Sequence, residues 1–267
     1  MRQTLKKTYA LFGPGRVGRN MAHYLRALGH DVTVLSRADA EERPGRCERA
    51  IIACDIVLAA VPDDALEAWR ARWAPVAGDR PLAHFSGAAT LRGVNSYHPL
   101  YSFPDDILNF DDLRSIAFAC APGQAAFRDI FPQAENLTFT VAAEDRAYYH
   151  ALAVISGNFS AFVWNETAKA FRTRFEMEGE KAGDNAKAPD MAAVLRAYFT
   201  SVVDRFAAAP ENSMTGPVAR RDRSSVKANL AALKTAQAES PQSTDLAKLY
   251  NAFLAAAWPD YEDDDKA

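Results

Sequence analysis

Gly13-Pro14-Gly15-Arg16-Val17-Gly18 decides the fold: it is a G-x-G-x-x-G sequence placed directly after the apolar run Tyr9 to Phe12. Downstream, apolar residues recur at the spacing of one helix face, namely Val17, Met21, Leu25 and Leu28. Gly29 ends this pattern at a position where a left-handed residue is favoured. An apolar strand, a glycine turn and an amphipathic helix in this order predict the opening unit of a Rossmann domain.

Each glycine of this turn meets a need of a pyrophosphate site. Gly13 permits the tight turn, Gly15 lets the backbone approach the phosphates, and Gly18 allows the helix to pack closely on the strand. The helix N-terminus then offers N–H groups and a partial positive charge. The loop as a whole, with Pro14, Arg16 and Val17, is therefore the first cofactor-binding candidate. The alternative is a glycine-rich structural turn.

The end of the second expected strand distinguishes NAD from NADP. An acidic residue about 20 positions after the first glycine binds the ribose 2′-hydroxyl in NAD sites. Here Leu35 is followed by Ser36 and Arg37, a hydroxyl and a guanidinium that suit a phosphate dianion. We therefore expect NADP as cofactor. Asp39 stands close enough to serve as the acidic residue of an NAD site, which would argue against NADP. The alternative for Arg37 is a solvated surface residue.

Short apolar runs separated by turn residues continue as far as residue 141. The expected strands are Tyr9 to Phe12, Asp31 to Leu35, Ile56 to Val61, Pro81 to Phe85, Val94 to Tyr97, Ser115 to Cys120 and Leu137 to Val141. This alternation predicts an α/β Rossmann domain with a mainly parallel sheet over residues 1–143. Ligands of such sheets bind outside the carboxyl ends of the strands. Val61 and Pro62, at the end of the third strand, are therefore further cofactor-binding candidates.

Helical spacing replaces this pattern after residue 143. Asp145 to Phe171 contains no proline, and its apolar residues step by three or four, which predicts one long amphipathic helix. A second helix is expected over 189–208. Two more follow, one carrying Val226, Leu230 and Leu233 and the other carrying Leu246, Leu249, Tyr250, Phe253 and Leu254. The polar segment Glu176 to Ala188 is expected to be an exposed loop. Residues 144–267 are thus predicted to form an all-α substrate and dimerisation domain, because helical halves of this kind often bury their apolar faces against a second copy.

The composition argues against several classes of protein. Lys and Arg number 31 against 34 Asp and Glu, so the net charge of −3 gives no global positive field to hold nucleic acid or an anionic membrane. No apolar run approaches the length of a membrane span. The three cysteines are odd in number and lack C-x-x-C spacing, which predicts reduced thiols in a cytoplasmic protein. Histidines and cysteines are scattered, so no metal site is expected.

Four motifs carry a resemblance to a known family. They are the glycine loop, His84-Phe85-Ser86-Gly87-Ala88, His98-Pro99-Leu100 and Thr215-Gly216-Pro217-Val218-Ala219-Arg220-Arg221-Asp222. With them the chain resembles the bacterial NADP oxidoreductase-like proteins, which combine an N-terminal Rossmann domain with a C-terminal helical domain of unknown function. These are distant relatives of pyrroline-5-carboxylate reductase, ketopantoate reductase and 6-phosphogluconate dehydrogenase. The family usually has glycine at the position of Arg221. The resemblance implies a reductase or dehydrogenase that is dimeric through its helical domain, and it implies no particular substrate.

Polar residues at the ends of the fourth and fifth strands are the leading candidates for chemistry. His98 is the general-acid candidate, because an imidazole can protonate the oxygen or nitrogen formed by hydride transfer. A histidine that braces a turn is the equal alternative. Ser86, beside Gly87, would let a nicotinamide ring and its substrate come near the backbone. His84 is expected to be structural, and the remaining histidines, His23, His30 and His150, are expected to be surface or packing residues.

Two residues of the helical half could contact a substrate. Asn158 follows Gly157 on the long helix, and its alternative is a buried packing amide. In related hydroxyacid dehydrogenases a catalytic lysine stands four residues before this asparagine, and Val154 here argues against that chemistry. Arg220 lies on a Gly-Pro loop and could clamp a substrate carboxylate, with a structural salt bridge as the alternative.

The sequence thus predicts an NADP(H)-dependent oxidoreductase that reduces a small carbonyl or imine compound bound between its two domains. A non-catalytic dinucleotide sensor or assembly protein, which kept the fold and lost turnover, is the alternative.

Overall fold

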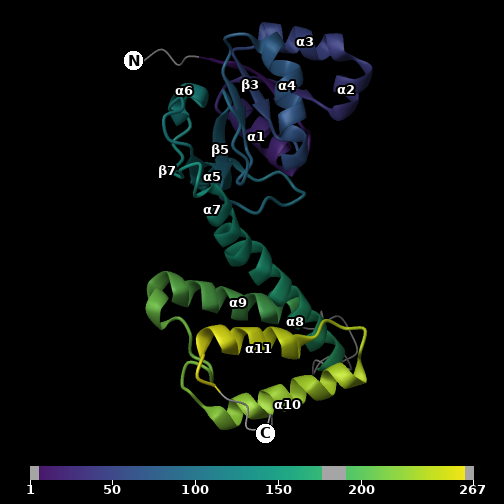
Figure 1. The fold of residues 1–267 in the computed structure, drawn as a ribbon, viewed down its shortest axis with the longest axis vertical. Coiled ribbons are helices and arrows are strands. Elements are labelled where there is room, and N and C mark those ends of the chain that lie inside the picture. Colours follow the sequence, from purple (N-terminus) through teal and green to yellow (C-terminus); the bar gives the residue numbers. More distant parts are fainter. Residues whose placement is uncertain (1–5, 176–190, 262–267) are drawn as a thin grey trace, which may run out of the picture. The chain divides into compact units, whose positions relative to one another are not determined.

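The computed structural model describes residues 6–175 and 191–261, which include all the residues named above as site candidates. The loop expected at Glu176 to Ala188 and the first two residues of the helix expected over 189–208 lie outside the described residues. The chain divides into two compact units, residues 1–158 and 159–267 (Figure 1). This division differs from the expected domains by the segment 144–158, which belongs with the first unit.

The first unit is built on a seven-stranded sheet with the order β2-β1-β3-β4-β5-β6-β7. The strands are β1 Thr8–Phe12, β2 Asp31–Leu35, β3 Ile56–Ala59, β4 Leu82–His84, β5 Asn95–Pro99, β6 Phe118–Cys120 and β7 Thr138–Thr140. All neighbouring pairs are parallel except β5 and β6. Every strand overlaps one of the expected runs. The predicted fold class, a Rossmann domain followed by helices, is confirmed.

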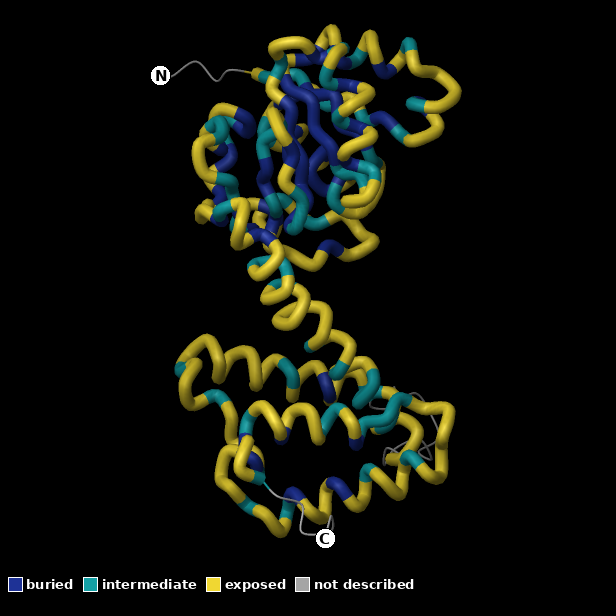
Figure 2. The backbone as a smooth tube through the Cα atoms, viewed as in Figure 1, coloured by how far each residue is buried: buried dark blue, intermediate teal, exposed yellow. Residues whose placement is uncertain are grey.

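Alternate residues of β1 enter the cores on the two faces of the sheet. Tyr9 and Leu11 are buried in a cluster that includes Met21 of helix α1 (Arg16–Ala27), whereas Phe12 packs with Trp73 of helix α4 (Leu66–Ala77) in the other cluster. Successive side chains of a strand point to opposite faces, so both faces of this sheet are covered, as parallel sheets require. Figure 2 shows the central strands buried in the middle of the first unit, whereas the edge strand β7 is exposed.

Helices cover both faces of this sheet. Those of the first unit are α1 Arg16–Ala27, α2 Arg37–Glu42, α3 Pro44–Ala53, α4 Leu66–Ala77, α5 Phe110–Ser115, α6 Phe127–Ile130 and α7 Arg146–Ala153. α1 ends as expected, because Gly29 adopts a φ of 91° just beyond it. The single helix expected over 145–171 is interrupted by a π-helical segment, Val154–Phe159, before it continues as α8, Ser160–Arg174.

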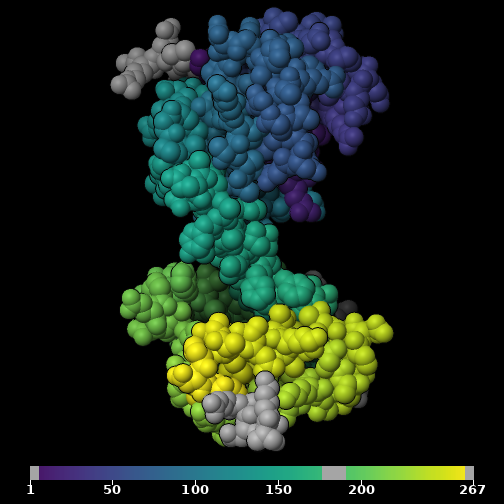
Figure 3. Space-filling view, viewed as in Figure 1, coloured from purple at the N-terminus to yellow at the C-terminus, as the bar shows by residue number. Residues whose placement is uncertain are grey.

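All the secondary-structure elements described in the second unit are helices. After α8 it contains α9 Met191–Ala208, α10 Arg223–Glu239 and α11 Leu246–Ala257. Asp222 and Asp245 cap α10 and α11 through their side chains. Val226, Leu254 and Trp258 belong to the buried cluster between α10 and α11. The outer surfaces of these two helices adjoin in Figure 3. Among the described residues, no helix combines the length and apolar character needed to span a bilayer.

Candidate functional site

The turns that follow β1 and β3 meet closely at Gly13. Its φ is 100°, and its N–H donates a 2.9 Å hydrogen bond to the carbonyl oxygen of Leu35, the last residue of β2. A Cβ at position 13 would lie 2.7 Å from the carbonyl carbon of Ala60, just after β3. Only glycine combines this φ with this spacing. The turn stands where β2 and β3 flank β1 on opposite sides, which is where Rossmann sheets bind their ligands.

Gly18 and Gly15 differ in the space around them. A Cβ at Gly18 would overlap the carbonyl group of Gly13, whose carbon would be only 3.0 Å away. A Cβ at Gly15 would meet no atom within 4 Å. Gly18 therefore brings α1 against β1, while Gly15 borders open space at the helix N-terminus. α1 has no side-chain cap and no acidic residue in its first turn, so this end of the helix fits a pyrophosphate.

The other residues of the glycine loop have separate surroundings. Pro14 is exposed, and Val17 is half-buried against the core. The Nε of Arg16 donates a 2.7 Å hydrogen bond to Asp105 Oδ1, and both side chains are mostly exposed. Exposed ion pairs of this kind contribute little to stability, because water and salt screen them. The pair with Asp105 therefore leaves Arg16 able to turn to a phosphate.

Asp39 is the carboxylate that would favour NAD over NADP, but neighbouring residues of the chain bind it. Ser36 and Asp39 form a reciprocal cap, in which Ser36 N–H donates to Asp39 Oδ2 at 2.9 Å and Asp39 N–H donates to Ser36 Oγ at 3.1 Å. Arg43 pairs with Asp39 Oδ1 at 2.6 Å, and Arg46 pairs with the same atom. The hydrogen bonds from Ser36, together with Arg46 and Arg43, lower the pKa of Asp39 to about 2. This carboxylate is thus buried and neutralised by arginines.

Arg37 has the opposite environment. Its side chain is 90% exposed, and its only described ion pair is with Glu41, one turn along α2, at 2.7 Å. Arg37 therefore offers an exposed guanidinium directly after the end of β2, next to Ser36. Val61, half-buried, and Pro62, exposed, follow β3 on the other side of the glycine turn.

A second group of polar residues gathers where β4 and β5 end. His84 is fully buried, and its Nδ1 accepts a 3.2 Å hydrogen bond from the Ser86 N–H. The Ser86 hydroxyl accepts hydrogen bonds from the N–H groups of Ala88 and Ala89, at 3.3 and 2.9 Å. Burial, followed by the charge of Arg146, lowers the pKa of His84 to about 4. His84 is therefore a neutral, structural histidine, and Ser86 shapes the turn after β4.

His98, on β5, contacts the beginning of α7. Its Nδ1 lies 2.7 Å from Tyr149 Oη, and the two rings meet edge to face. On its other side, a Cβ added at Gly87 would lie 3.0 Å from His98 Nε2. Burial, then the charges of His150 and Arg146, lower the pKa of His98 to about 4, so the ring is neutral at pH 7. Among the described residues no group of His, Cys, Asp and Glu side chains could hold a metal ion.

Arg146 is a charged residue that is buried in this region. The residue is 2% exposed, and its Nη1 and Nη2 atoms are buried with no hydrogen-bond partner among the described residues. Burial lowers its pKa. A buried charge without a partner is costly, so Arg146 is a candidate for a functional role.

Neither Arg146 nor Tyr149 stands out in the sequence, and His150 is expected there to be a surface or packing residue. In the structure the His150 ring centroid lies 6.3 Å from that of His98. Arg146, Tyr149 and His150 are spaced i, i+3, i+4, which places them on one helix face. The sequence signal that could have revealed this group is the R-x-x-Y-H spacing at the start of the expected long helix.

The two candidates from the helical half lie elsewhere. Asn158 is exposed in the π-helical segment, at the end of the first unit, so the alternative of a buried packing amide does not hold. Arg220 belongs to the second unit, where its Nη1 donates a hydrogen bond to the carbonyl oxygen of Thr215. Thus His98 and Ser86 come together at neighbouring strand ends, while the substrate contacts expected of Asn158 and Arg220 stay predictions.

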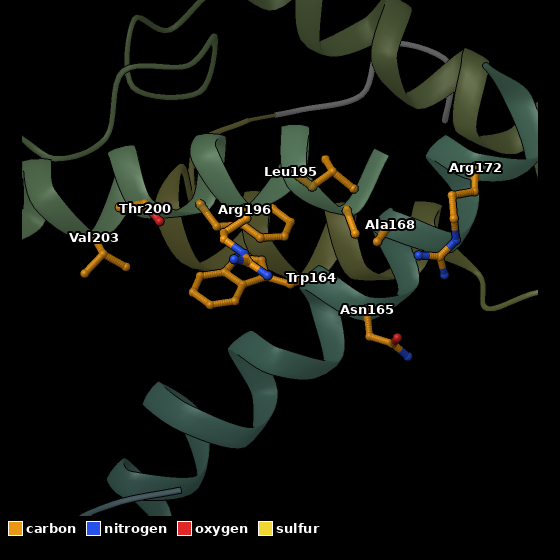
Figure 4. A pocket seen from close by; sticks show the side chains of 10 residues that line it. Trp164, Asn165, Ala168, Arg172, Leu195, Arg196, Thr200 and Val203 are labelled. Atoms are coloured by element: carbon orange, nitrogen blue, oxygen red, sulfur yellow. The ribbon is translucent and has the colours of Figure 1, made fainter. Parts of the chain in front are cut away.

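The second unit contains a groove of about 460 Å³ between α8 and α9 (Figure 4). Trp164 of α8 and Phe199 of α9 stack in it with ring centroids 4.8 Å apart. Arg172 and Arg196 also line it, and the rest of the lining is mostly apolar. The groove includes none of the candidate residues for cofactor or proton transfer, and we assign it no chemistry.

A protein-family model matches residues 118–256, and the family is described as Domain of unknown function (DUF2520). The match runs from β6 into α11 and covers just over half of the chain. A search of curated proteins found no match.

Several solved structures share the fold. BF3122 from Bacteroides fragilis, named as an NADP oxidoreductase, is 16% identical with a TM-score of 0.65 and covers 94% of this chain and 98% of its own. Protein TM1727 from Thermotoga maritima is 18% identical with a TM-score of 0.58, over 93% and 96% of the two chains. A reductive aminase from Aspergillus terreus, solved with NADPH and ethyl levulinate, is 17% identical with a TM-score of 0.57, over 95% and 94%. At these identities the likeness establishes the fold.

Proposed function

The chain belongs to the family described as Domain of unknown function (DUF2520), and we propose that it is an NADP(H)-dependent reductase of a small carbonyl or imine compound. The observation that carries this proposal is the contrast within the glycine turn. Gly13 and Gly18 have no room for a Cβ, whereas Gly15 borders open space at an uncapped helix N-terminus. A merely structural turn needs the first two features and not the third.

The environment of Asp39 supports NADP over NAD. An NAD site needs a carboxylate that is free to accept hydrogen bonds from the ribose hydroxyls. Asp39 is buried and bound by Ser36, Arg43 and Arg46, while Arg37 is exposed beside it. A 2′-phosphate would therefore meet cations at this position. The structure of the reductive aminase with NADPH is consistent with this cofactor for the fold.

His98 supports reduction chemistry at the neighbouring strand ends. The bound cofactor would supply the hydride, and the oxygen or nitrogen of the substrate would then need a proton. His98 Nε2 lies against Gly87, in the turn after β4, so this nitrogen would be the atom that passes a proton to the substrate. A substrate carboxylate held by Arg220 remains a prediction from sequence.

Cofactor binding is tested first, by thermal unfolding with NADPH and with NADH. A ligand at 100 times its dissociation constant stabilises the folded chain by about 2.7 kcal/mol. We expect the larger shift with NADPH, and no shift with either dinucleotide would contradict the proposal. Turnover is then measured as NADPH oxidation with a panel of keto acids and cyclic imines. Binding without any turnover would favour the alternative, a dinucleotide sensor or assembly protein.

We also propose that the protein is a cytoplasmic homodimer. Phe162 of α8 and Tyr198 and Phe206 of α9 are exposed, and exposed residues predominate along both helices (Figure 2). Exposed apolar surfaces often mark sites of protein–protein contact, and a second copy of the chain would cover these residues. Light scattering at micromolar concentration tests this, and a monomeric mass would contradict it. The three free cysteines are consistent with a reducing compartment.

A further inference from the structure

Three polar residues at the start of α7 act on His98 of β5, two by contact and Arg146 by its charge. Arg146, Tyr149 and His150 share one helix face. Tyr149 Oη is 2.7 Å from His98 Nδ1, and the His150 ring meets the His98 ring edge to face. In the function proposed above, His98 alone supplies the proton, and neither Tyr149 nor Arg146 has a part.

His98 by itself is a poor proton donor at neutral pH. Its pKa of about 4 leaves the ring neutral, with one N–H. A neutral imidazole that gives up this proton becomes an imidazolate, a strong base, unless its second nitrogen receives a proton in the same step. The hydroxyl beside that second nitrogen belongs to Tyr149.

We propose that Tyr149, His98 and Arg146 form a proton relay in which Tyr149 reloads His98 at Nδ1 and Arg146 balances the negative charge left on Tyr149. The inference rests on the proposed reductase function and deepens it. His98 is the residue that meets the substrate, whereas Tyr149 and Arg146 are positioning residues that act through it.

The chemistry of the two groups sets the direction of the hydrogen bond. A phenol is an acid with a pKa near 10, and an unprotonated imidazole nitrogen is a good acceptor. Tyr149 therefore donates and His98 Nδ1 accepts, which leaves the imidazole proton on Nε2. This nitrogen faces Gly87 and has no hydrogen-bond partner among the described residues.

The transfer balances without an external acid. As hydride reaches the carbon of a C=O or C=N group, the Nε2–H bond of His98 breaks and its proton joins the substrate oxygen or nitrogen. The Tyr149 O–H bond breaks in the same step, and its proton joins His98 Nδ1. His98 is neutral before and after, with its proton moved from Nε2 to Nδ1, and Tyr149 is left as a phenolate. His98 Nδ1 then returns its proton to the Tyr149 phenolate, and a proton from solvent replaces the one lost from Nε2, so each turnover consumes one solvent proton.

In this scheme Arg146 gains a partner for its charge, which it lacks among the described residues before the proton moves. Its two Nη atoms are buried and unpartnered among the described residues, while its charge opposes the rise in the pKa of Tyr149 that burial causes. A phenolate at Tyr149 would supply the missing counter-charge. The other charged or titratable groups that act on His98 are His150 of α7, His84 of β4 and Asp63 after β3.

The test that needs neither cofactor nor substrate is the tautomer of His98. Long-range proton–nitrogen correlation spectra of protein labelled at the histidine nitrogens distinguish protonated from unprotonated ring atoms, and His98→Gln assigns the signal. At pH 7 we expect the proton on Nε2 in the wild type, and a mixture of tautomers in Tyr149→Phe. Tyr148→Phe is the matched control, since Tyr148 is exposed on the same turn, and it should keep the wild-type tautomer. A proton on Nδ1 in the wild type, or no change in Tyr149→Phe, would overturn the relay.

Turnover of any substrate found for the wild type gives the second readout. Tyr149→Phe should lower kcat by about 10- to 100-fold, part of the range that general acids contribute, with KM and NADPH affinity little changed. The wild-type kcat should be flat from the His98 pKa of about 4 up to the raised pKa of Tyr149. A lone imidazolium donor would instead lose activity as pH rises above its own pKa. Equal kcat values for Tyr149→Phe and Tyr148→Phe would overturn the relay, whereas failure of the reductase proposal would appear as wild-type protein that binds no NADPH.

Discussion

Gly18 on α1 packs so closely on Gly13 that a side chain at position 18 would overlap the carbonyl group of Gly13. This contact brings the N-terminus of α1 next to the end of β1. The N–H groups of the helix then open onto the space beside Gly15. One glycine therefore serves packing and the other serves binding, and substitutions should separate the two roles.

Gly15→Ala should fold normally and bind NADPH poorly. The φ of Gly15 is −68°, which alanine adopts without strain, and the new methyl group would meet no protein atom. Replacing glycine at such a position stabilises a fold by about 0.4–1 kcal/mol. The methyl group would occupy the space expected for the pyrophosphate, so we expect the NADPH dissociation constant to rise at least about tenfold, a change of about 1.4 kcal/mol. Thermal unfolding and cofactor titration measure the two effects.

Gly18→Ala is the contrasting variant. Its methyl group would press against a backbone carbonyl, which cannot move aside as a flexible side chain can. Overpacking of this kind costs about 1–3 kcal/mol, so the variant should lose stability before any ligand is added. Equal stability of the two variants would show that α1 does not depend on this close approach.

Arg37→Ala should weaken NADPH binding and leave NADH binding unchanged. Hydrogen bonds to a charged group contribute about 1.5–3 kcal/mol, which corresponds to a loss of about 10- to 100-fold for the phosphorylated cofactor. Arg128→Ala, another exposed arginine of the first unit, is the control. Equal losses of affinity for NADPH and NADH would show that Arg37 does not contact the 2′-phosphate.

The glycine turn, the strand positions and the helical second half could be predicted from the sequence, because each depends on neighbours in the chain. A strand needs a short apolar run, and Gly13 needs only its place between β1 and α1 to be recognised. The same local reasoning identified Ser36 and Arg37 at the end of β2. It also left Asp39 ambiguous, because the local pattern does not show that Arg43 and Arg46 pair with its carboxylate.

The surroundings of His98 could not be predicted in this way. Tyr149 lies 51 residues further along the chain, and its contact with His98 depends on how α7 packs against β5. The depth of burial of Arg146 is likewise a tertiary property, because an arginine in the first turn of a helix is ordinarily solvated. Local spacing shows that Arg146 and Tyr149 share a helix face, and only the fold shows what that face meets.

Acid should destabilise the first unit over a pH range set by its buried histidines. The pKa of His84 and that of His98 are each lowered from 6.5 to about 4, chiefly by burial. Between these values the unfolded chain binds more protons than the folded one, so stability falls as pH falls from about 6.5 to about 4. Each histidine contributes at most about 1.4 kcal/mol per pH unit to this slope.

Urea unfolding at several pH values measures this slope. His84→Gln and His98→Gln should each flatten it, and His23→Gln, at an exposed position on α1, should not. The lowered pKa of Asp39, about 2, affects stability only at lower pH. A wild-type stability that stays constant from pH 6.5 to pH 4 would mean that neither imidazole is held neutral by the fold.

Arg221 occupies a backbone conformation that favours glycine, and its substitution should show how the chain compensates. Its φ is 57°, and its guanidinium carbon lies 4.9 Å from the centre of the Trp258 ring. A left-handed conformation costs a residue other than glycine about 1–2 kcal/mol, and an exposed cation–π contact returns about 0.5–1 kcal/mol. Arg221→Gly removes both effects and should change stability little, whereas Arg221→Ala keeps the strain, loses the contact and should be less stable than Arg221→Gly by about 1 kcal/mol. Chemical unfolding of the two variants beside Arg205→Ala, an exposed arginine of α9, measures this order; an alanine variant as stable as the glycine variant would show that the backbone at position 221 relaxes out of the left-handed region.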